Sequence, residues 1–369
     1  MKNSVIEIHA PMKIEVFILL LMTTLFVACT QEEDPKVEYD PTLYSIAFGH
    51  FPNPNLPVDN LPTNAGVELG RMLFYEKALS RDRSMACADC HQQIDMFSDI
   101  RQFSIGVDQL PGKRQAMPIF NIAWHKNGMF WDGRAPRARD QALMPIQDPL
   151  EMHETLENAV AKLQAMQIYK DQFVRAFGDD TITPERMGLA IEQFEFTIIS
   201  NHSKFDHFMQ GGITLTESEE RGRVLFFREF DPFLGQKGGE CFHCHGGFNF
   251  TNDQFMNNGL DADDEMSDLG RFIVTNEPVD KARFKVPSLR NIALTPPYMH
   301  DGRFATLEEV IEHYATGVKP STTVDELLFH NTEPGGLQLT TQDKADLVAF
   351  LKTLTDEGLK TNDLFASPF

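Results

Sequence analysis

Basic residues are scarce in this sequence. Its 33 Lys and Arg are outnumbered by 54 Asp and Glu, which gives a formal net charge of −21 and a pI near 4.9. Such a surface repels nucleic acid and anionic membranes, whereas a small basic protein would be attracted by long-range steering. Apolar residues make up 42% of the chain. This is enough for one large core or two modest ones, so we expect a two-domain globular protein.

Apolar runs of membrane-spanning length are also missing. Residues 16–27 form an apolar run that is too short to span a bilayer and has the layout of a signal peptide, so residues 1–29 are excluded from the fold. The run ends at Cys29 and is followed by polar residues, which resembles the lipobox of bacterial lipoproteins. The resemblance implies that Cys29 is the lipidated N-terminus of a periplasmic protein anchored to a membrane of the cell envelope. The alternative is ordinary signal cleavage beside an incidental cysteine, and Met12 is an alternative start.

Cysteine is rare as well, and once Cys29 is set aside the other four form two Cys-x-x-Cys-His units, which leaves none for a disulfide. Each unit fits the attachment signature of c-type haem. Two thiols at this spacing can each bond one vinyl group of the same porphyrin, and the next side chain then directs its imidazole at the iron. A zinc site would need four converging ligands, and a dithiol redox pair gives no reason for the histidine. We predict two covalently bound haem c groups, attached through Cys87 and Cys90 and through Cys241 and Cys244, with His91 and His245 as iron ligands.

Other segments occur twice, in the same order around the two units. This repetition and the helical signals between the segments predict a mainly α fold of two cytochrome c-like haem domains related by internal duplication, with long loops wrapping the cofactors. The boundary is expected near Gly211-Gly212, giving domains at residues 30–211 and 212–369. The repeated segments are 70–74 and 222–226, 118–123 and 287–293, and 132–134 and 301–303.

Capping residues mark several helix starts in the sequence. The closing helix is expected to present an apolar face to its haem, as the last helix of a c-type cytochrome does. Residues 51–62, rich in Pro and Asn, predict a loop. The predicted starts are Thr183 before Pro184, Thr216 with Glu219, and Thr340 before an apolar face of Leu347, Phe350, Leu351 and Leu354.

The order of these motifs resembles the bacterial di-haem cytochrome c peroxidase and MauG family over nearly the whole mature chain. The resemblance implies two cytochrome c-like domains that face each other, with one haem reacting with hydrogen peroxide and the other passing electrons. The first haem, held by His91, is then the reactive one. A small cytochrome c or cupredoxin is the implied electron donor, and a homodimer is a further expectation.

The resemblance also assigns roles to three residues near the first haem. Trp131 is expected to bridge electrons between the haems, and Gln141 and Glu151 are expected to lie over the reactive iron. Without the family pattern, a core tryptophan and two solvated side chains would be the simpler interpretation. Peroxide reduction needs a proton to move from one oxygen to the other, and one positioned carboxylate can carry it. Glu151 is the candidate, with a pKa that burial could bring near working pH.

The two haems are expected to differ in their second iron ligand. The family's distal histidine is replaced by Val107 after Ser-Ile-Gly, so the first haem is expected to be accessible to peroxide without prior reduction. At the second haem, Tyr314 shares the apolar face of a helix that Thr306 and Glu309 cap, and it is preferred over Met299 as distal ligand. A core tyrosine, with a third ligand or none, is the alternative.

A calcium ion between the domains is implied by the resemblance, near a Leu-Thr-x-Pro segment. Thr295 and Pro297 would offer backbone carbonyls, and Gln115 stands where the family has asparagine. Glutamine keeps the amide oxygen but lengthens the side chain by one methylene, which places the affinity in doubt.

Three functions follow from these features. A cytochrome c peroxidase type of oxidoreductase, which reduces hydrogen peroxide to water, is preferred. Tyr314 and Val107 favour a MauG-like oxidase that modifies a protein substrate. A di-haem electron carrier or redox sensor is the third, although a carrier needs no acid-base pair such as Glu151 and Gln141.

Overall fold

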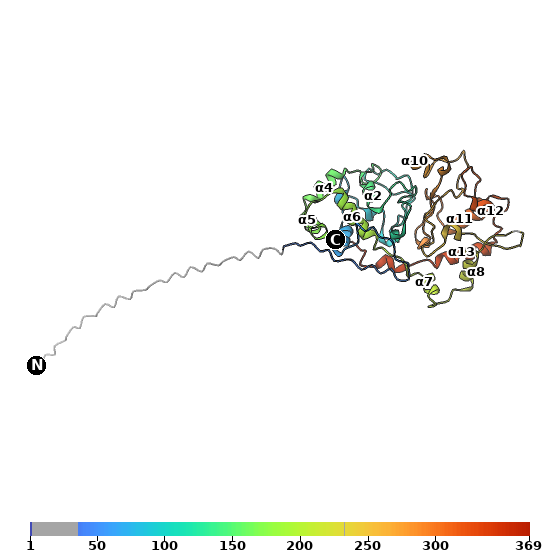
Figure 1. Cartoon of the computed structure of the whole chain (residues 1–369), viewed down its shortest axis with the longest axis horizontal. Helices are drawn as coiled ribbons and strands as arrows, with labels where there is room; N and C mark the ends of the chain where they lie inside the picture. Colours follow the sequence, from blue (N-terminus) through green and yellow to red (C-terminus); the bar gives the residue numbers. More distant parts are fainter. Residues whose placement is uncertain (2–35, 232) are drawn as a thin grey trace. The chain divides into compact units, whose positions relative to one another are not determined.

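The computed structural model describes Met1 and residues 36–231 and 233–369. The predicted signal peptide, Met12 and Cys29 lie outside the described residues. Within the described part, no helix is both long enough and apolar enough to cross a membrane. Residues Val37–Phe369 form one compact unit (Figure 1).

Helices dominate this unit, and the sheet found among its described residues has two short antiparallel strands, β1 (Phe255–Met256) and β2 (Phe284–Lys285). The prediction of a mainly α fold is confirmed. The helices are α1 (Asn64–Tyr75), α2 (Ala138–Gln141), α3 (Met144–Gln147), α4 (Leu156–Gln164), α5 (Gln167–Phe177), α6 (Pro184–Glu195), α7 (Lys204–Met209), α8 (Glu217–Phe226), α9 (Phe242–His245), α10 (Phe272–Thr275), α11 (Leu307–Glu312), α12 (Phe329–Thr332) and α13 (Thr341–Lys352).

Two helix pairs, α1 with α6 and α8 with α13, approach each other closely at a glycine. A Cβ at Gly70 would lie 1.9 Å from the backbone oxygen of Ala190, and a Cβ at Gly222 would lie 1.8 Å from that of Asp346. Neither position has room for a side chain, so both glycines are required by the helix crossings. The repeated Gly-Arg-x-Leu-Phe segment therefore marks the first helix of each pair.

The predicted helix starts are confirmed. The side chains of Thr183, Thr216 and Thr340 each accept a hydrogen bond from the backbone N–H three residues on, as N-caps of α6, α8 and α13. Each such cap typically contributes roughly 0.5–2 kcal/mol of stability.

The extent of the closing helix needs correction at Leu354. Helix α13 ends at Lys352, where Thr353 N–H and Leu354 N–H donate to oxygens only three residues back and so tighten the last turn. Leu354 is nevertheless fully buried, so it contributes to the core from beyond the helix.

The buried apolar side chains of the described residues form several clusters, of which three are large. The first cluster draws on residues between Ala65 and Ile191, and the second on residues between Phe205 and Leu354. The third joins residues of the first half to Leu359 and Phe365 near the C-terminus. The chain end therefore returns to the helices of the first half, as Figure 1 shows.

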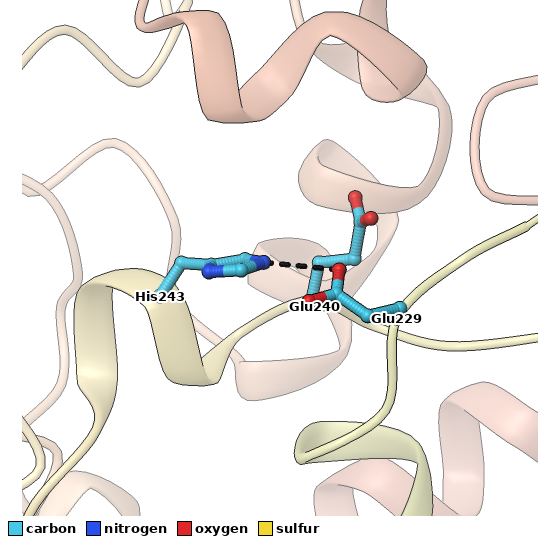
Figure 2. A group of neighbouring side chains, drawn as sticks. All are labelled: Glu229, Glu240 and His243. Atoms are coloured by element: carbon cyan, nitrogen blue, oxygen red, sulfur yellow. Dashed lines mark hydrogen bonds and ion pairs between the residues drawn. The ribbon is translucent and has the colours of Figure 1, made fainter.

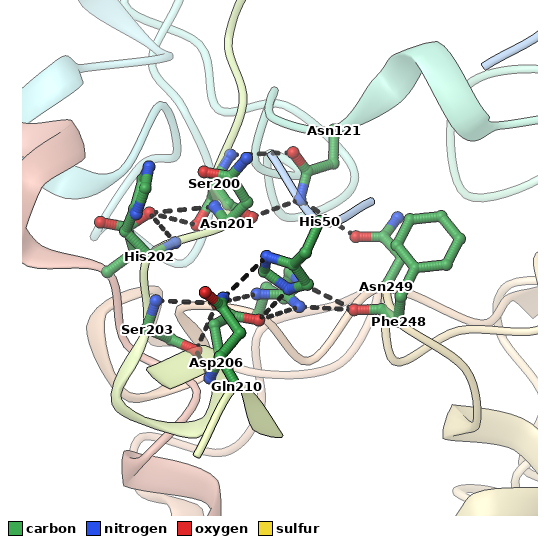
Figure 3. A network of polar contacts seen from close by, with 12 residues as sticks. His50, Asn121, Ser200, Asn201, His202, Ser203, Asp206, Gln210, Phe248 and Asn249 are labelled. Atoms are coloured by element: carbon green, nitrogen blue, oxygen red, sulfur yellow. Dashed lines mark hydrogen bonds and ion pairs between the residues drawn. The ribbon is translucent and has the colours of Figure 1, made fainter. Parts of the chain in front are cut away.

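A buried polar network fixes the segment that follows α6 (Figure 3). Asn121 and Asn291, from the two Asn-Ile-Ala segments, both have left-handed backbone, with φ of 55° and 56°. Asn121 Oδ1 accepts from Ser200 N–H at 2.9 Å, and Asn291 Oδ1 accepts from Asp356 N–H at 2.8 Å. Asn291 Nδ2 also donates to Ser200 Oγ at 2.9 Å. Both repeated segments are thus tied to the connection between α6 and α7.

Candidate functional site

Both Cys-x-x-Cys-His units form one tight turn that ends at the histidine. His91 N–H donates to Cys87 O at 2.9 Å, and His245 N–H donates to Cys241 O at 2.8 Å. Burial raises the pKa of Cys90 to about 11 and the pKa of the other three thiols to about 12. Thiols that resist ionisation are poor redox nucleophiles, which disfavours a dithiol redox pair. Within the described residues, these thiols belong to no group of three or more converging His, Cys, Asp or Glu ligand atoms, which disfavours a zinc site.

The two histidine rings are oriented in the same way. His91 Nδ1 lies 3.1 Å from Phe97 O, and His245 Nδ1 lies 3.2 Å from Phe250 O. A ring that donates through Nδ1 keeps the lone pair on Nε2, which is how iron-ligating histidines are fixed. Burial lowers the pKa of both rings, to about 4 for His245, so both are neutral and able to bind metal. The residues present therefore fit two haem c groups.

A cavity of about 1150 Å³ lies beside the first unit. It exceeds the ~300–1,000 Å³ typical of small-molecule sites, as a porphyrin together with a substrate requires. His91, Trp131, Gln141 and Glu151 all line this cavity, which we call the first-haem cavity. The structure therefore brings the predicted residues of the first haem together, and their roles remain predictions.

Glu151 lies in the turn that follows α3. Burial and nearby Asp148 raise the pKa of its carboxyl to about 7, and Arg134 opposes the shift. This pKa is suited to a group that accepts and returns a proton near neutral pH.

Val107, which stands where the resemblance would place a distal histidine, is buried. Its N–H donates to Glu151 O at 2.9 Å, and a Cβ at Gly106 would lie 2.1 Å from Leu150 O. The Ser-Ile-Gly segment is therefore packed directly against the turn that carries Glu151. The accessibility of the first haem remains a prediction.

Trp131 is held in the wall of the first-haem cavity by its indole and by its backbone. Nε1 donates to Gln115 O at 2.8 Å, and the backbone oxygen of Trp131 accepts from Lys285 N–H at 2.7 Å. Trp131 is buried, with 8% of its surface exposed. Because these contacts come from segments far apart in sequence, the indole has a fixed position where they meet.

Tyr314 and Met299, the two candidate ligands of the second haem, both contact the side-chain amide of Asn258. Asn258 Nδ2 lies 3.3 Å from Tyr314 Oη and 3.3 Å from Met299 Sδ. Thr306 and Glu309 cap α11 as predicted, but this helix ends at Glu312, so the predicted place of Tyr314 on it is corrected. Tyr314 belongs to the π-helical turn that follows, His313–Gly317, a local irregularity that is frequent at functional sites. Burial raises the pKa of Tyr314 to about 12, Asn258 opposes the shift, and the cysteines of the second unit add to it. A phenolate would therefore form there only beside a bound cation such as iron.

The predicted calcium ligands lie in ordered backbone. Gln115 is 5% exposed, and its Nε2 donates to Ser98 Oγ at 3.3 Å and to Asp99 O at 3.2 Å. Thr295 is also buried, and Pro297 follows it by two residues. The amide oxygen of Gln115 accepts no hydrogen bond among the described residues, and the calcium site remains a prediction.

Glu195 and His125 also line the first-haem cavity, and neither was predicted from the sequence. Glu195 is 3% exposed, its carboxyl makes no hydrogen bond among the described residues, and burial and Glu192 raise its pKa to about 8. Glu195 could have been recognised in the sequence, because it lies four residues after Ile191, at a position of the helix where an apolar residue is expected. Burial lowers the pKa of His125 to about 4, and no motif marked this residue.

The histidine between the thiols of the second unit points to other partners (Figure 2). His243 Nε2 lies 3.1 Å from Glu229 Oε2, and Glu240 completes a group whose ligand atoms lie within 4.8 Å of one another. His243 is thus engaged with a carboxylate, which leaves His245 as the iron ligand of this unit.

Comparison with known proteins gives matches over most of the chain. A family model described as di-haem cytochrome c peroxidase matches residues 64–214. The methylamine utilization protein MauG of Methylophilus methylotrophus is 34% identical over 82% of this chain and 86% of its own. Cytochrome c551 peroxidase of Nitrosomonas europaea is 35% identical over 80% of this chain and 82% of its own. A crystal structure of a MauG-like protein associated with microbial copper homeostasis superposes with a TM-score of 0.77 at 36% identity, covering 86% of this chain and 97% of that one.

Proposed function

Because the chain belongs to the di-haem cytochrome c peroxidase and MauG family, we propose that it reduces hydrogen peroxide to water with electrons from a small cytochrome c or cupredoxin. The observation that carries the proposal is the convergence of His91, Trp131, Gln141 and Glu151 on one cavity. A non-catalytic carrier or sensor gives no reason for this convergence.

The two haems would be held by His91 and His245, and when bound they supply the iron that exchanges electrons with peroxide and with the donor. Glu151 then accepts a proton from one peroxide oxygen and returns it to the other, which leaves as water. Gln141 supplies a neutral amide to orient the substrate. The whole reaction consumes one peroxide, two electrons and two protons and yields two waters.

Electrons are proposed to enter at the second haem and to pass Trp131 on the way to the first. The fixed indole in the cavity wall supports this path. The net charge of −21 suits a basic donor, because opposite charge accelerates encounter at low salt.

We infer that the two haem units arose by internal duplication, with domains at residues 30–211 and 212–369. Support comes from Gly70 and Gly222, which make the same contact in their helix pairs, and from Asn121 and Asn291, which share a backbone conformation. Both histidine rings also use the same type of carbonyl partner.

A MauG-like oxidase acting on a protein side chain is the second candidate, and partly buried Tyr314 beside the second unit favours it. Rapid mixing with peroxide separates the functions. Oxidation of two one-electron donors per peroxide supports the peroxidase. A long-lived oxidised state with poor donor turnover supports the oxidase, and no reaction contradicts both.

Replacing Tyr314 by phenylalanine is expected to change the absorption and electron paramagnetic resonance spectra of the second haem, because the phenol oxygen is the proposed iron ligand. Met299→Leu is expected to leave these spectra unchanged. Tyr169→Phe is the matched control, because that buried tyrosine instead donates to Glu76 in the first half. Unchanged spectra in Tyr314→Phe, with a change in Met299→Leu, would assign the ligand to the methionine.

Cys29→Ser is expected to release the exported protein from the membrane fraction, because the thiol that would carry the lipid is lost. Fractionation of cells expressing each form, followed by intact mass, checks this. Wild-type protein recovered free of membranes, with a mass that lacks lipid, would show that ordinary signal cleavage is the correct interpretation.

A further inference from the structure

A second cavity, of about 470 Å³, is positively charged although the protein is strongly acidic. Three cationic side chains line it, against one carboxylate, that of Asp280. Lys126 and Arg283 form no ion pair within the described residues, and Arg271 Nε lies 3.8 Å from Asp280. The other lining residues are Asn127, Gly128, Gly133, Pro136, Gln254 and Phe255, none of which lines the first-haem cavity.

One hydrogen-bond donor of Arg283 is buried without an acceptor. Its Nε–H is buried and has no hydrogen-bond acceptor within the described part of the chain. A buried donor on a cation is unfavourable unless an acceptor reaches it. The backbone of Arg283 is fixed, because its oxygen accepts from Arg271 N–H at 2.8 Å. The side chain of Arg283 lines the cavity, and no hydrogen bond or ion pair within the described residues uses its guanidinium.

Arg271 is also positioned by its surroundings. Its guanidinium carbon lies 3.9 Å from the centre of the Phe255 ring, and Nη1 donates to Asp132 O at 3.0 Å. Gly133 has φ of 71°, and a Cβ there would lie 2.7 Å from Arg271 Nη1. The absence of a side chain at Gly133 thus lets the guanidinium take this place. Planar guanidinium groups held in this way suit the oxygens of phosphate.

We propose that this cavity binds a phosphate group, either free or carried by a small organic molecule. The net negative charge of the protein repels anions from the rest of its surface. Three cationic side chains at one place would therefore favour an anion that carries more than one charge. The volume falls within the ~300–1,000 Å³ of small-molecule sites, which leaves room for an organic part beside the phosphate.

Calorimetric titration of the protein carrying both haems with inorganic phosphate, at constant ionic strength in chloride, tests the proposal. One saturable site per chain is expected. Arg283→Gln is expected to weaken binding by about tenfold or more, equal to about 1.4 kcal/mol. Arg228→Gln is the matched control, because this exposed arginine forms no ion pair among the described residues and lies outside the cavity.

Lys126→Gln, at an exposed side chain, serves as the second variant and is expected to weaken binding severalfold without affecting folding. Titration with ribose 5-phosphate distinguishes the sources of the group. Tighter binding than inorganic phosphate indicates an organic phosphate, and equal binding indicates free phosphate. Absence of saturable binding, or binding unaffected by both Arg283→Gln and Lys126→Gln, would overturn the proposal.

Discussion

Glu151→Gln is expected to slow the reaction with hydrogen peroxide by roughly 10²–10⁴-fold, the range for loss of a positioned acid-base group. The amide has nearly the same shape as the carboxyl but cannot accept the proton. The side chain lines the first-haem cavity beside Gln141, so both haem spectra are expected to persist. Rapid-mixing absorbance at several peroxide concentrations gives the second-order rate constant.

The pH dependence adds an independent test. Glu151 must be ionised to accept a proton, and burial raises its pKa to about 7. The wild-type rate constant is therefore expected to increase as pH rises through about 7, and Glu151→Gln is expected to lose that increase. If the rate constant of Glu151→Gln still changes near pH 8, the change would be assigned to Glu195, whose pKa burial raises to about 8. Glu157→Gln, at an exposed position of α4, is the control. A variant with the wild-type rate and pH profile would remove Glu151 from the chemistry.

Trp131→Phe is expected to slow donor-driven peroxide turnover by about tenfold or more, which is about 1.4 kcal/mol in barrier height. Phenylalanine fills most of the same space but is much harder to oxidise, and it cannot donate to Gln115 O. The slowed step is the transfer between haems. The rate at which the donor reduces the second haem should therefore be unchanged, and separate absorbance bands can follow the two steps.

Trp124→Phe is the matched control for this change. Trp124 is the other tryptophan of the chain, its Nε1 donates to Pro52 O at 2.9 Å, and it does not line the first-haem cavity. Equal turnover in wild type and Trp131→Phe would exclude the indole from the electron path. Slow reduction of the second haem in Trp131→Phe would place the defect at donor docking instead.

The features that sequence could predict are those set by local chemistry. Thiol spacing identified the two haem units, and Thr183, Thr216 and Thr340 identified helix starts because an N-cap acts within one turn. Gly70 and Gly222 repeat because each helix crossing excludes a side chain. The thiol spacing and the caps depend on a few neighbouring residues, and for that reason they can be seen in one sequence. The two glycines could be recognised only because their segment repeats, since each helix crossing joins residues more than a hundred positions apart.

Contacts between distant segments could not be predicted. Asn258 lies between Met299 and Tyr314 through a long-range fold that no local pattern encodes. The indole of Trp131 was assigned from the resemblance, whereas its hydrogen bond to Gln115 O came only from the structure. The positive cavity around Arg283 likewise depends on segments that are more than a hundred residues apart.

The central claim is that each Cys-x-x-Cys-His unit carries one haem. Intact mass of the mature protein, produced in a host that attaches haem c, tests it most directly. The mass of the polypeptide plus two haems is expected, with one haem lost when Cys87 and Cys90 are replaced by serine and one lost when Cys241 and Cys244 are replaced. Wild-type protein that carries no haem, or a pair of serine substitutions that leaves the haem content unchanged, would contradict the claim.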